Sequence, residues 1–392
     1  MKKRKICLIT GSRADYGILS HLMGQLKQNP LIELQIIATN MHLSPEYGMT
    51  VTEIEEGGFS VDKKVEMLLS SDTAAGTVKS MGLGMIGFAD AFQDLNPDLL
   101  IILGDRYEML SAASAAQIFG IPIAHIHGGE ITEGAYDDAI RHAITKLSYL
   151  HFTSSEEYKN RVIQMGEFPN RVFNIGSLSL DGINNEERLD IKELENSIGT
   201  KLGKNFILVT YHPVTREPGT AKTQITNLLK ALEKENRKIL FTLPNSDNDG
   251  RIISDIIKQW CKENPNRGTA VESLGKKRYF SALSLCGAVI GNSSSGIIEA
   301  PSFKVPTLNI GDRQKGRTQG NTVVNCDTDI DSIRSGLKKV LSDDFIKFVN
   351  NHGYNPYFKE DSINIFDRII TTVELPKHSK KQFYDIIIDK KV

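Results

Sequence analysis

Residues able to carry acid–base or metal chemistry are concentrated in one stretch, AHIHGGEITEGAYDDAIRH, which spans residues 124–142. It contains three His, two Glu, two Asp and one Arg. His125 and His127 lie two apart on an expected strand, and so on one face, but no third His or Cys follows at a spacing typical of a zinc site. We therefore expect no metal here. The carboxylates of this stretch point to proton transfer instead.

Three acids stand where strands are expected to end or helices to begin. Asp105 follows the apolar run LIIL, and Glu130 follows IPIAHI and an HGG turn. Carboxylates at the ends of adjacent buried strands face one cleft, where desolvation and mutual repulsion raise their pKa values toward neutrality. Asp137 opens the helical pattern YDDAIRHAITK, where it serves either as a third acid or as a helix cap. Arg141 lies one turn later and is expected to orient Asp137.

A second group of residues is suited to phosphate. The run GNSSSG, residues 291–296, follows an apolar strand and opens an expected helix, so its backbone N–H groups and the helix N-terminus could hold phosphate oxygens. It matches neither the Walker A pattern nor the dinucleotide fingerprint, and a serine-capped helix start remains the alternative. A basic segment at 313–317, which includes Arg313, favours a diphosphate pocket around Ser293 and Ser294.

Three further residues each carry two interpretations. Glu299 is expected in the helix after the serines, where it either holds both hydroxyls of a ribose or is solvated. Arg13 in GSRADYG either reaches a phosphate or is an ordinary first-turn arginine. His212 in VTYHPVT, at the end of an expected strand, is either a proton donor and acceptor or a neutral phosphate ligand.

These motifs stand at the ends of strands in a regular alternation of strands and helices. Apolar runs predict strands at 5–10, 33–39, 98–103, 121–126, 150–155, 206–212, 238–243, 287–292 and 305–310. Helical patterns lie between them, among others at 106–119, 136–148, 222–235, 276–285 and 362–373. Continuous apolar strands are covered on both faces, so the chain is predicted to form two doubly wound parallel-sheet α/β domains. Ligands bind at the carboxyl ends of such strands, where the motifs lie.

Length and composition fit two soluble domains. With 392 residues the chain exceeds a typical single domain, and a polar stretch at 178–199 divides it into expected domains 1–180 and 181–365 and a tail 366–392. A net charge of -1 excludes recruitment of nucleic acid or anionic membrane by a global field. No apolar run approaches a membrane span, and four cysteines without a C-x-x-C pair suit reduced thiols, so we expect a cytoplasmic protein.

In content and order, the motifs GSRADYG, LGDRYE, HIHGGE, YDDAIRHAITK, FNIGS, GNSSSGIIEAPS and NIGDRQKGR closely resemble those of the hydrolysing UDP-N-acetylglucosamine 2-epimerases. The resemblance runs from about residue 5 to 370 and is greatest for the bacterial sialic-acid branch. It implies a GT-B fold, with two Rossmann-like domains and the active site between them. It also implies a homodimer or homotetramer joined through the N-terminal domain, and catalysis without a metal or nicotinamide cofactor.

The resemblance further implies the reaction and the roles of residues. A base removes the proton at C2 while UDP leaves C1, and water then adds to the resulting 2-acetamidoglucal, which gives UDP and N-acetylmannosamine for sialic acid synthesis. The implied acid and base groups are Asp105, Glu130, Asp137 and His212. The implied substrate-binding residues are Arg13, Arg106, Arg141, His212, Asn245, Phe280, Ser293, Ser294, Glu299 and Arg313. Among these, Glu299 is expected on the ribose and Phe280 near the uracil.

Other activities remain open at this point. A sister branch acts on UDP-N,N'-diacetylbacillosamine by the same elimination, and discrimination between the sugars is expected near residues 42–48 and 130–138. Non-hydrolysing relatives typically read HxEAGLR and PEExNR where this chain has HGGE and YDDAIRH, which favours the hydrolysing branch. A GT-B glycosyltransferase or a non-catalytic UDP-sugar sensor would share the nucleotide loop without needing three acids together.

Overall fold

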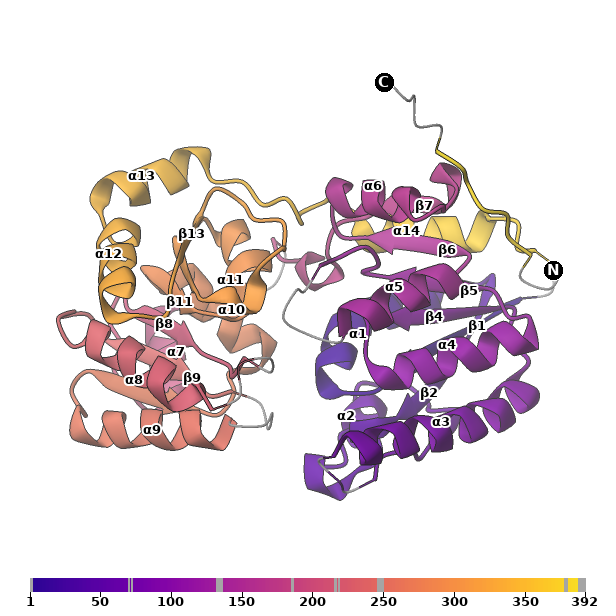
Figure 1. Cartoon of the computed structure of the whole chain (residues 1–392), viewed down its shortest axis with the longest axis horizontal. Coiled ribbons are helices and arrows are strands. Elements are labelled where there is room, and N and C mark those ends of the chain that lie inside the picture. Colours follow the sequence, from indigo (N-terminus) through magenta and orange to yellow (C-terminus); the bar gives the residue numbers. More distant parts are fainter. Residues whose placement is uncertain are drawn as a thin grey trace. The chain divides into compact units, whose positions relative to one another are not determined.

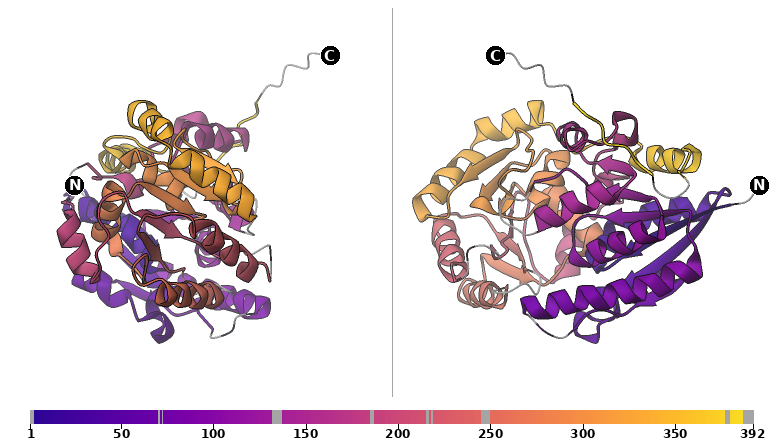
Figure 2. Two further views of the ribbon diagram at one scale, coloured as in Figure 1. Left: turned by 90° about the vertical axis from the view of Figure 1, so that its left-hand side faces the viewer. Right: turned by 45° about the vertical axis from the view of Figure 1, so that its right-hand side comes forward.

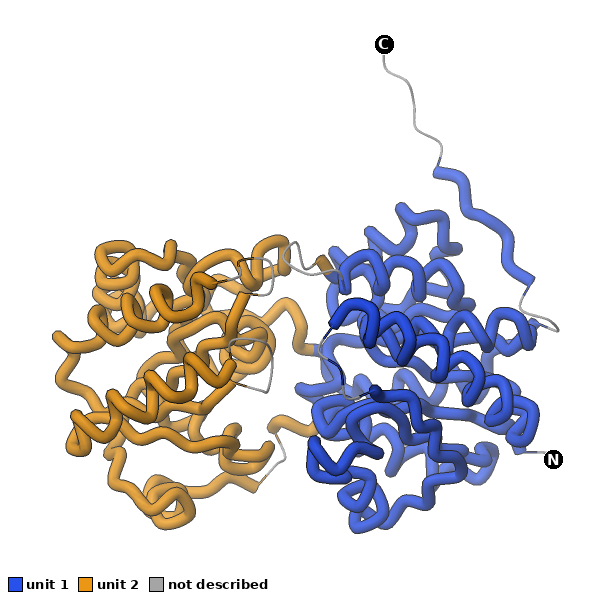
Figure 3. Tube along the Cα trace, turned by 60° about the horizontal axis from the view of Figure 1, so that its bottom comes forward, with its two compact units in different colours: residues 1–130, 136–181, 359–392 blue, residues 131–135, 182–358 orange. Residues whose placement is uncertain are grey.

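The computed structural model divides the chain into two units, which are coloured separately in Figure 3. Residues 1–130, 136–181 and 359–392 form unit 1, and residues 131–135 and 182–358 form unit 2. The structure describes residues 3–69, 71, 73–131, 137–184, 187–214, 217, 219–244, 250–376 and 380–386. Each unit has its own parallel sheet, as Figure 1 shows, and its own buried core.

Unit 1 is built on a seven-stranded parallel sheet with the order β3-β2-β1-β4-β5-β6-β7. Its strands are β1 (Arg4–Thr10), β2 (Ile32–Thr39), β3 (Lys63–Val65), β4 (Leu99–Leu103), β5 (Ile123–Ile126), β6 (Leu150–Thr153) and β7 (Val172–Asn174). In the middle of the sheet, Leu8 of β1 lies opposite Ile36 of β2 and Ile101 of β4. The strand order reverses here, and this switch point puts the loops that follow β1 and β4 next to each other.

Helices cover both faces of this sheet, as the views in Figure 2 show. They are α1 (Arg13–Gln28), α2 (Val51–Glu56), α3 (Ala74–Leu95), α4 (Tyr107–Phe119), α5 (Asp137–Leu147), α6 (Glu156–Gln164) and α14 (Ser362–Thr372). Ile6 and Leu8 of β1 pack with α1, α2 and α14, whereas Cys7 and Ile9 pack with α3, α4 and α5. Each such aliphatic side chain, when fully buried, stabilises the fold by about 1.5–3 kcal/mol. None of the described helices is long and apolar enough to span a membrane.

Unit 2 is built on a six-stranded parallel sheet with the order β10-β9-β8-β11-β12-β13. Its strands are β8 (Ile207–Thr210), β9 (Ile239–Thr242), β10 (Gly268–Val271), β11 (Ala288–Gly291), β12 (Thr307–Ile310) and β13 (Val323–Cys326). Its helices are α7 (Ile191–Ile198), α8 (Ala221–Leu232), α9 (Gly250–Glu263), α10 (Gly275–Leu285), α11 (Ser295–Ile298), α12 (Ile330–Val340) and α13 (Asp343–His352). One face of the central strands packs with α8, α9 and α12, around Ile225, Ile257 and Leu337.

The predicted class, two doubly wound parallel sheets, is confirmed. Every strand predicted from an apolar run is present and lies inside a sheet, while β3, β7, β10 and β13 have no counterpart in the prediction. These four are the edge strands of the two sheets. An edge strand has one neighbour and partly exposed side chains, so sequences such as KKV in β3 and VVNC in β13 lack the apolar run that marks a central strand.

The last helix, α14, returns the chain to unit 1. Ile363 and Phe366 join the core that lies on the α1 side of the sheet, and Ser362 Oγ donates to the backbone oxygen of Ile175 at 2.5 Å. The return therefore begins at residue 359, ahead of the expected tail boundary at 366, because the helix is anchored to unit 1 from its first turn.

Candidate active site

Arg141 joins the acidic segments at the carboxyl end of the unit 1 sheet. It lies on α5, is 2% exposed, and its guanidinium binds the carboxylate of Asp105, which follows β4. The same group donates to Asp138 Oδ1 at 3.2 Å and to the backbone oxygen of Glu130 at 2.8 Å. The sequence pattern predicted Asp137 as its partner. The guanidinium instead forms its side-chain hydrogen bonds with the carboxylates of Asp105 and Asp138. The charge of Arg141 lowers the pKa of Asp137 from a distance.

Asp137 is the first residue of α5 and carries a perturbed carboxyl group. Burial raises its pKa to about 6, and the negative charge of Asp105 adds to the increase, while Arg106 and Arg141 oppose it. A group with this pKa gains and loses a proton near neutral pH. Its electrostatic setting is the one that proton transfer requires.

Glu130 is held by side chains from two successive strand ends. It follows β5, is 4% exposed, and accepts a hydrogen bond from Ser154 Oγ at 2.7 Å on Oε1. His127 Nδ1 lies 3.6 Å from the same oxygen. His127 has a left-handed backbone with φ of 67°, which turns the chain just after β5. The carboxyl group of Glu130 is therefore fixed in a buried, polar setting.

His125 supports the backbone that leads to Asp105. Its ring is fully buried, Nε2 donates to the backbone oxygen of Gly104 at 2.8 Å, and Nδ1 lies 3.2 Å from Thr145 Oγ1. Burial lowers its pKa to about 3, so the ring is neutral. Among the residues that the structure describes, no group of three or more His, Cys, Asp and Glu side chains is arranged to hold a metal ion.

Two acids that the sequence motifs did not single out, Asp15 and Glu108, belong to the same end of the sheet. They lie in the first turns of α1 and α4, which follow the neighbouring strands β1 and β4. Burial raises the pKa of Asp15 to about 6. The positive charge of Arg106 opposes this increase, and the negative charge of Glu108 adds to it. Arg13, the first residue of α1, is exposed. The position of both acids, in the first turn of the helix that follows a central strand, is the signal that would have identified them.

In unit 2, the ends of β8 and β11 lie side by side, with Thr210 opposite Gly291. Gly291 has φ of 137°, and a Cβ atom there would lie 1.9 Å from the Thr210 oxygen, so only glycine fits. The next residue, Asn292, is fully buried and accepts a hydrogen bond from the His212 N–H at 2.7 Å. Its Nδ2 donates to the His212 oxygen, also at 2.7 Å. The GNSSSG loop is thereby fixed to the loop that follows β8.

His212 is held as a neutral imidazole. Burial lowers its pKa to about 3, and the positive charge of Arg313 contributes to the decrease. Its buried Nδ1 has no hydrogen-bond partner among the described residues. Of the two interpretations drawn from the sequence, the neutral ligand fits this setting, and a group that titrates near working pH does not.

The serine loop leads into a shorter helix than the sequence pattern predicted. α11 has four residues, and Glu299 stands directly after it instead of inside a longer helix. So short a helix supplies little macrodipole, and anion binding here must rest on backbone N–H groups and nearby cations. Ser293 and Ser294 are half-buried, and Arg313 Nη1 donates to the backbone oxygen of Asn292 at 3.0 Å. The structure thus brings the predicted residues Ser293, Ser294 and Arg313 around one loop.

Phe280 and Asn245 were predicted near the uracil and the sugar phosphate. Phe280 is 4% exposed, and its ring packs against Phe303 with the centroids 5.5 Å apart. Its ring therefore belongs to the interior of unit 2, and the expected contact near the uracil stays a prediction. Asn245 lies outside the described residues. Tyr279, not singled out in the sequence, donates to Ser295 Oγ at 2.6 Å and supports the serine loop from α10.

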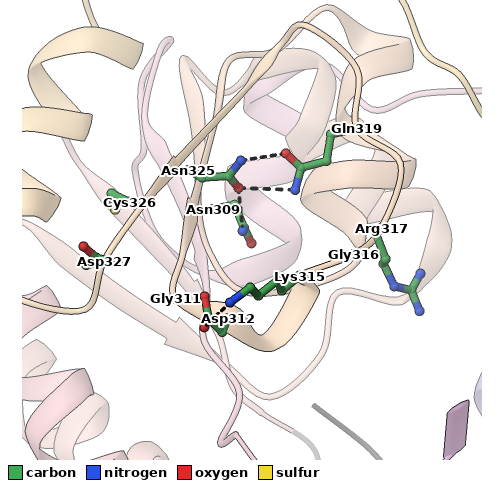
Figure 4. Close-up of a pocket in the computed structure, with 10 residues that line it drawn as sticks. All are labelled: Asn309, Gly311, Asp312, Lys315, Gly316, Arg317, Gln319, Asn325, Cys326 and Asp327. Atoms are coloured by element: carbon green, nitrogen blue, oxygen red, sulfur yellow. Dashed lines mark hydrogen bonds and ion pairs between the residues drawn. The ribbon is translucent and has the colours of Figure 1, made fainter. Parts of the chain in front are cut away.

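A pocket of about 480 Å³ opens at the carboxyl ends of β12 and β13, and Figure 4 shows the side chains around it. Gln319 and Asn325 pair through their amides at 2.8 and 3.2 Å, and Asn309 Nδ2 donates to Asn325 Oδ1 at 2.8 Å. Lys315 and Arg317, from the basic segment noted in the sequence, also line it. The amide network anchors the loop between β12 and β13 to the sheet.

Comparison with known proteins places the chain among nucleotide-sugar enzymes. A family model described as UDP-N-acetylglucosamine 2-epimerase matches residues 24–372. The GDP/UDP-N,N'-diacetylbacillosamine 2-epimerase (hydrolyzing) of Campylobacter jejuni is 44% identical over 88% of this chain and 89% of its own. Polysialic acid biosynthesis protein P7 of Escherichia coli is 40% identical over 98% of both chains.

Among solved structures, the UDP-GlcNAc 2-epimerase of Neisseria meningitidis bound to UDP-GlcNAc matches with a TM-score of 0.80 at 17% identity. The match covers 93% of this chain and 99% of the other. At this identity the match shows the fold alone. The predicted GT-B architecture, with two Rossmann-like domains, is confirmed.

Proposed function

Since the chain belongs to the UDP-N-acetylglucosamine 2-epimerase family, we propose that it is a hydrolysing 2-epimerase whose preferred substrate is UDP-N,N'-diacetylbacillosamine. The choice of sugar is supported by the 44% identity to the Campylobacter jejuni enzyme that bears this activity in its name. The sugar expected from the sequence motifs, UDP-N-acetylglucosamine, is the second candidate. It is supported by the polysialic acid relative, which matches over 98% of both chains.

The proposed reaction class rests on one observation, the group of acids at one end of the unit 1 sheet. In the proposed first step, a carboxylate takes the C2 proton, the C2–H electrons form the C1–C2 double bond, and the C1–O bond breaks to release UDP. We assign proton transfer at the sugar to Asp105, Glu130 and Asp137, which Arg141 and α5 draw together. Asp137 suits a proton that is held between steps, because its pKa is about 6.

In the second step, water adds across the double bond of the bound glucal. Its hydroxyl goes to C1, and a proton goes to C2 on the face opposite to the one that lost the first proton. The net reaction consumes one water and yields UDP and the free 2-epimer of the amino sugar. A protonated carboxyl must supply the C2 proton while a carboxylate accepts one from water, which requires more than one acid.

Unit 2 carries groups suited to the nucleotide. Charge that develops on the departing diphosphate is stabilised by cations and by N–H donors. Arg313 is such a cation, and the serine loop offers N–H and hydroxyl groups beside it. A neutral His212 can donate from one ring nitrogen without a positive charge of its own. We assign to nucleotide binding the unit 2 residues His212, Ser293, Ser294, Glu299 and Arg313, and we assign Arg13 and Arg106 of unit 1 to substrate binding.

We further propose that copies of the chain associate through unit 1 as a homodimer or homotetramer. Val78 and Ile86 on α3 are 65% and 66% exposed, and Ile118 near the end of the adjacent α4 is 85% exposed. Exposed large apolar side chains on adjacent helices are a feature of protein–protein contact surfaces. Light scattering during gel filtration gives the mass. Ile86→Glu with Ile118→Glu should produce monomers, and a monomeric native chain would contradict the proposal.

Turnover in deuterated water tests the function. The native chain is incubated with UDP-N,N'-diacetylbacillosamine, with its GDP counterpart and with UDP-N-acetylglucosamine, and the products are identified by NMR. We expect nucleoside diphosphate and a free sugar with deuterium at C2, and the highest kcat/KM for UDP-N,N'-diacetylbacillosamine. A higher kcat/KM for UDP-N-acetylglucosamine would assign the second candidate.

Other outcomes of the same experiment would overturn the reaction class. Release of UDP without deuterium at C2 would rule out elimination. Binding without turnover of any of the three nucleotide sugars would indicate a sensor. Transfer of the sugar to an added acceptor, with its C2 configuration kept, would indicate a glycosyltransferase.

A further inference from the structure

Glu108 is a buried carboxylate of unit 1 to which neither the motifs nor the proposed mechanism gives a role. It lies in the first turn of α4, its side chain is 0% exposed, and it accepts a hydrogen bond from Arg106 Nε at 2.6 Å. Its Oε2 atom is buried without a hydrogen-bond partner among the described residues. Desolvation makes such an oxygen costly, so a carboxylate kept in this setting calls for an explanation.

Gly11 provides the space in which Glu108 lies. It follows β1, the neighbour of β4 in the sheet, and a Cβ atom on it would lie 2.7 Å from Glu108 Oε1. Any other residue would therefore displace the carboxylate or the loop. The Gly11 N–H also binds Asp15 Oδ2 at 3.3 Å. Glu108, and after it Asp15, raise the pKa of Arg106, so two carboxylates stabilise its charge.

The Arg106 guanidinium is held at two of its nitrogens, while its side chain remains partly exposed. Nε donates to Glu108 at 2.6 Å, Nη2 donates to Met41 Sδ at 3.8 Å, and 40% of the Arg106 side chain is exposed. Arginine binds phosphate and carboxylate groups through pairs of N–H groups on one edge of its plane. A guanidinium held through Nε and Nη2 therefore presents its remaining N–H groups in a set direction. Arg106 directly follows Asp105, so it belongs to the acidic end of the sheet.

We propose that Glu108 is a positioning residue which, in the space left by Gly11, holds Arg106 so that its guanidinium binds an anionic group of the nucleotide sugar. The proposal rests on the proposed function, since the anionic group belongs to that substrate. Arg106 touches the substrate, and Glu108 acts through Arg106. A role for Glu108 in stability alone would change the melting temperature without changing KM.

Kinetics of Glu108→Gln, which keeps the volume and removes the charge, test this role. We expect KM to rise and kcat/KM to fall by about 10- to 100-fold, the effect of a binding group misplaced by roughly an ångström. Arg106→Ala should lower kcat/KM at least as much. The double variant should be no worse than Arg106→Ala, because Glu108 then has nothing to position. Native kinetics in Glu108→Gln, or fully additive losses, would overturn the proposal.

Gly11→Ala tests the same contact, because its methyl group displaces the Glu108 carboxylate without removing it. We expect a rise in KM similar to that of Glu108→Gln. When Gly11→Ala is combined with Glu108→Ala, the new methyl group has room, and the kinetic constants should equal those of Glu108→Ala alone. An unchanged KM in Gly11→Ala would count against the proposal even if the Glu108 variants failed to fold.

A matched control and a readout without turnover separate this role from the reaction itself. Glu157 pairs with Arg161 at 3.0 Å on α6 of the same unit, and Glu157→Gln should keep native kinetics. The NMR signal of the Arg106 Nε–H, assigned by its loss in Arg106→Lys, should shift and exchange faster in Glu108→Gln. An unaltered signal would contradict the positioning role. Absence of turnover in the native chain would contradict the proposed function instead.

Discussion

Asn292 and the backbone of His212 are joined by two hydrogen bonds, one in each direction and each 2.7 Å long. The amide side chain is fully buried and bridges the loops that follow the adjacent strands β8 and β11. One loop carries His212 and the other carries the serines proposed to bind diphosphate. A neutral amide therefore sets the relative position of two segments of the proposed nucleotide site.

Asn292→Ala should weaken both the fold and nucleotide binding. It leaves the His212 N–H and oxygen without their partners, so we expect a loss of about 2–6 kcal/mol in the free energy of unfolding, given about 1–3 kcal/mol for each unpaired buried group. UDP affinity should fall as well, because the loops lose their register. Urea unfolding and calorimetric titration with UDP measure the two effects. Asn325→Ala, which removes amide hydrogen bonds elsewhere in unit 2, is the control, and an equal loss of UDP affinity there would refute the claim.

His212 should not titrate between about pH 5 and pH 8, the range in which an ordinary histidine changes its charge. Burial, and then the charge of Arg313, holds the pKa of its imidazole near 3. The ring carbon and proton shifts, assigned by comparison with His212→Gln, should stay constant across this range. The histidines of the urea-unfolded chain serve as a titrating reference. A midpoint for His212 near that reference would show that it is able to act as an acid or base.

Asp137 should produce a slope in stability against pH. Its pKa is about 6 in the folded chain against an ordinary 3.8, so the folded chain binds this proton more tightly than the unfolded chain. The stability that this group contributes is present below the ordinary value and is lost as pH rises through about 6. The free energy of unfolding of Asp137→Asn minus that of the native chain should therefore be larger at about pH 8 than at about pH 4. Thermal melts at both pH values measure this.

The same substitution should remove a limb of the pH–rate profile. We expect kcat/KM of Asp137→Asn to fall by about 10²–10⁴-fold and to lose the inflection near pH 6. Asp331, an exposed acid at the start of α12, provides the control, and Asp331→Asn should keep both the rate and the profile. If Asp137→Asn kept the native inflection, another group would have to be its source.

Lys381 should stabilise unit 1 although it lies near the end of the chain. Its Nζ donates to both carboxylate oxygens of Glu167 at 2.8 and 2.9 Å and to the backbone oxygen of Ser148 at 2.8 Å. Glu167 is 3% exposed and keeps Lys146 as a partner at 2.5 Å, so Lys381→Met should cost about 1.5–3 kcal/mol of unfolding free energy, the contribution of a hydrogen bond to a charged group.

The control for Lys381 is an ion pair on the surface. Lys277 binds Glu187 at 2.6 Å, but the two side chains are 51% and 85% exposed. Lys277→Met should therefore cost less than about 1 kcal/mol. Equal losses in the two variants would mean that burial of Glu167 does not strengthen its pairing with Lys381. Chemical denaturation of both variants decides this.

The length of α11 could have been predicted from the sequence. The apolar residues of GNSSSGIIEAPSF fit a helix that continues past Glu299, but Pro301 lacks a backbone N–H and disfavours helical geometry in the residue before it. The helix ends at Ile298, and Pro301 lies within a separate 3₁₀ helix. Glu299 lies outside the helix because the helix-ending effect of Pro301 outweighs the apolar pattern.

The grouping of Asp105, Glu130 and Asp137 followed from the order of parallel strands, which places successive strand ends together. The pairing of Arg106 with Glu108 could not be read in this way, because residues two apart do not face each other on a helix. Arg106 precedes α4 with an extended backbone, φ of -75° and ψ of 156°, and this turns its side chain back over the first turn. Side-chain partners at such junctions depend on torsion angles that residue types alone do not specify.

The return of α14 to unit 1 has a consequence for synthesis on the ribosome. Phe366 of α14 packs on Phe152 of β6 with ring centroids 4.1 Å apart, so part of one face of the first sheet stays uncovered until α14 has been translated. Unit 2, drawn mainly from 182–358, is complete before then. The later-translated half can therefore mature first, against the usual N-to-C order of domain folding. A premature stop codon between unit 2 and α14 would spare the unit just translated and leave unit 1, whose strands were made earlier, without the helix that packs on Phe152.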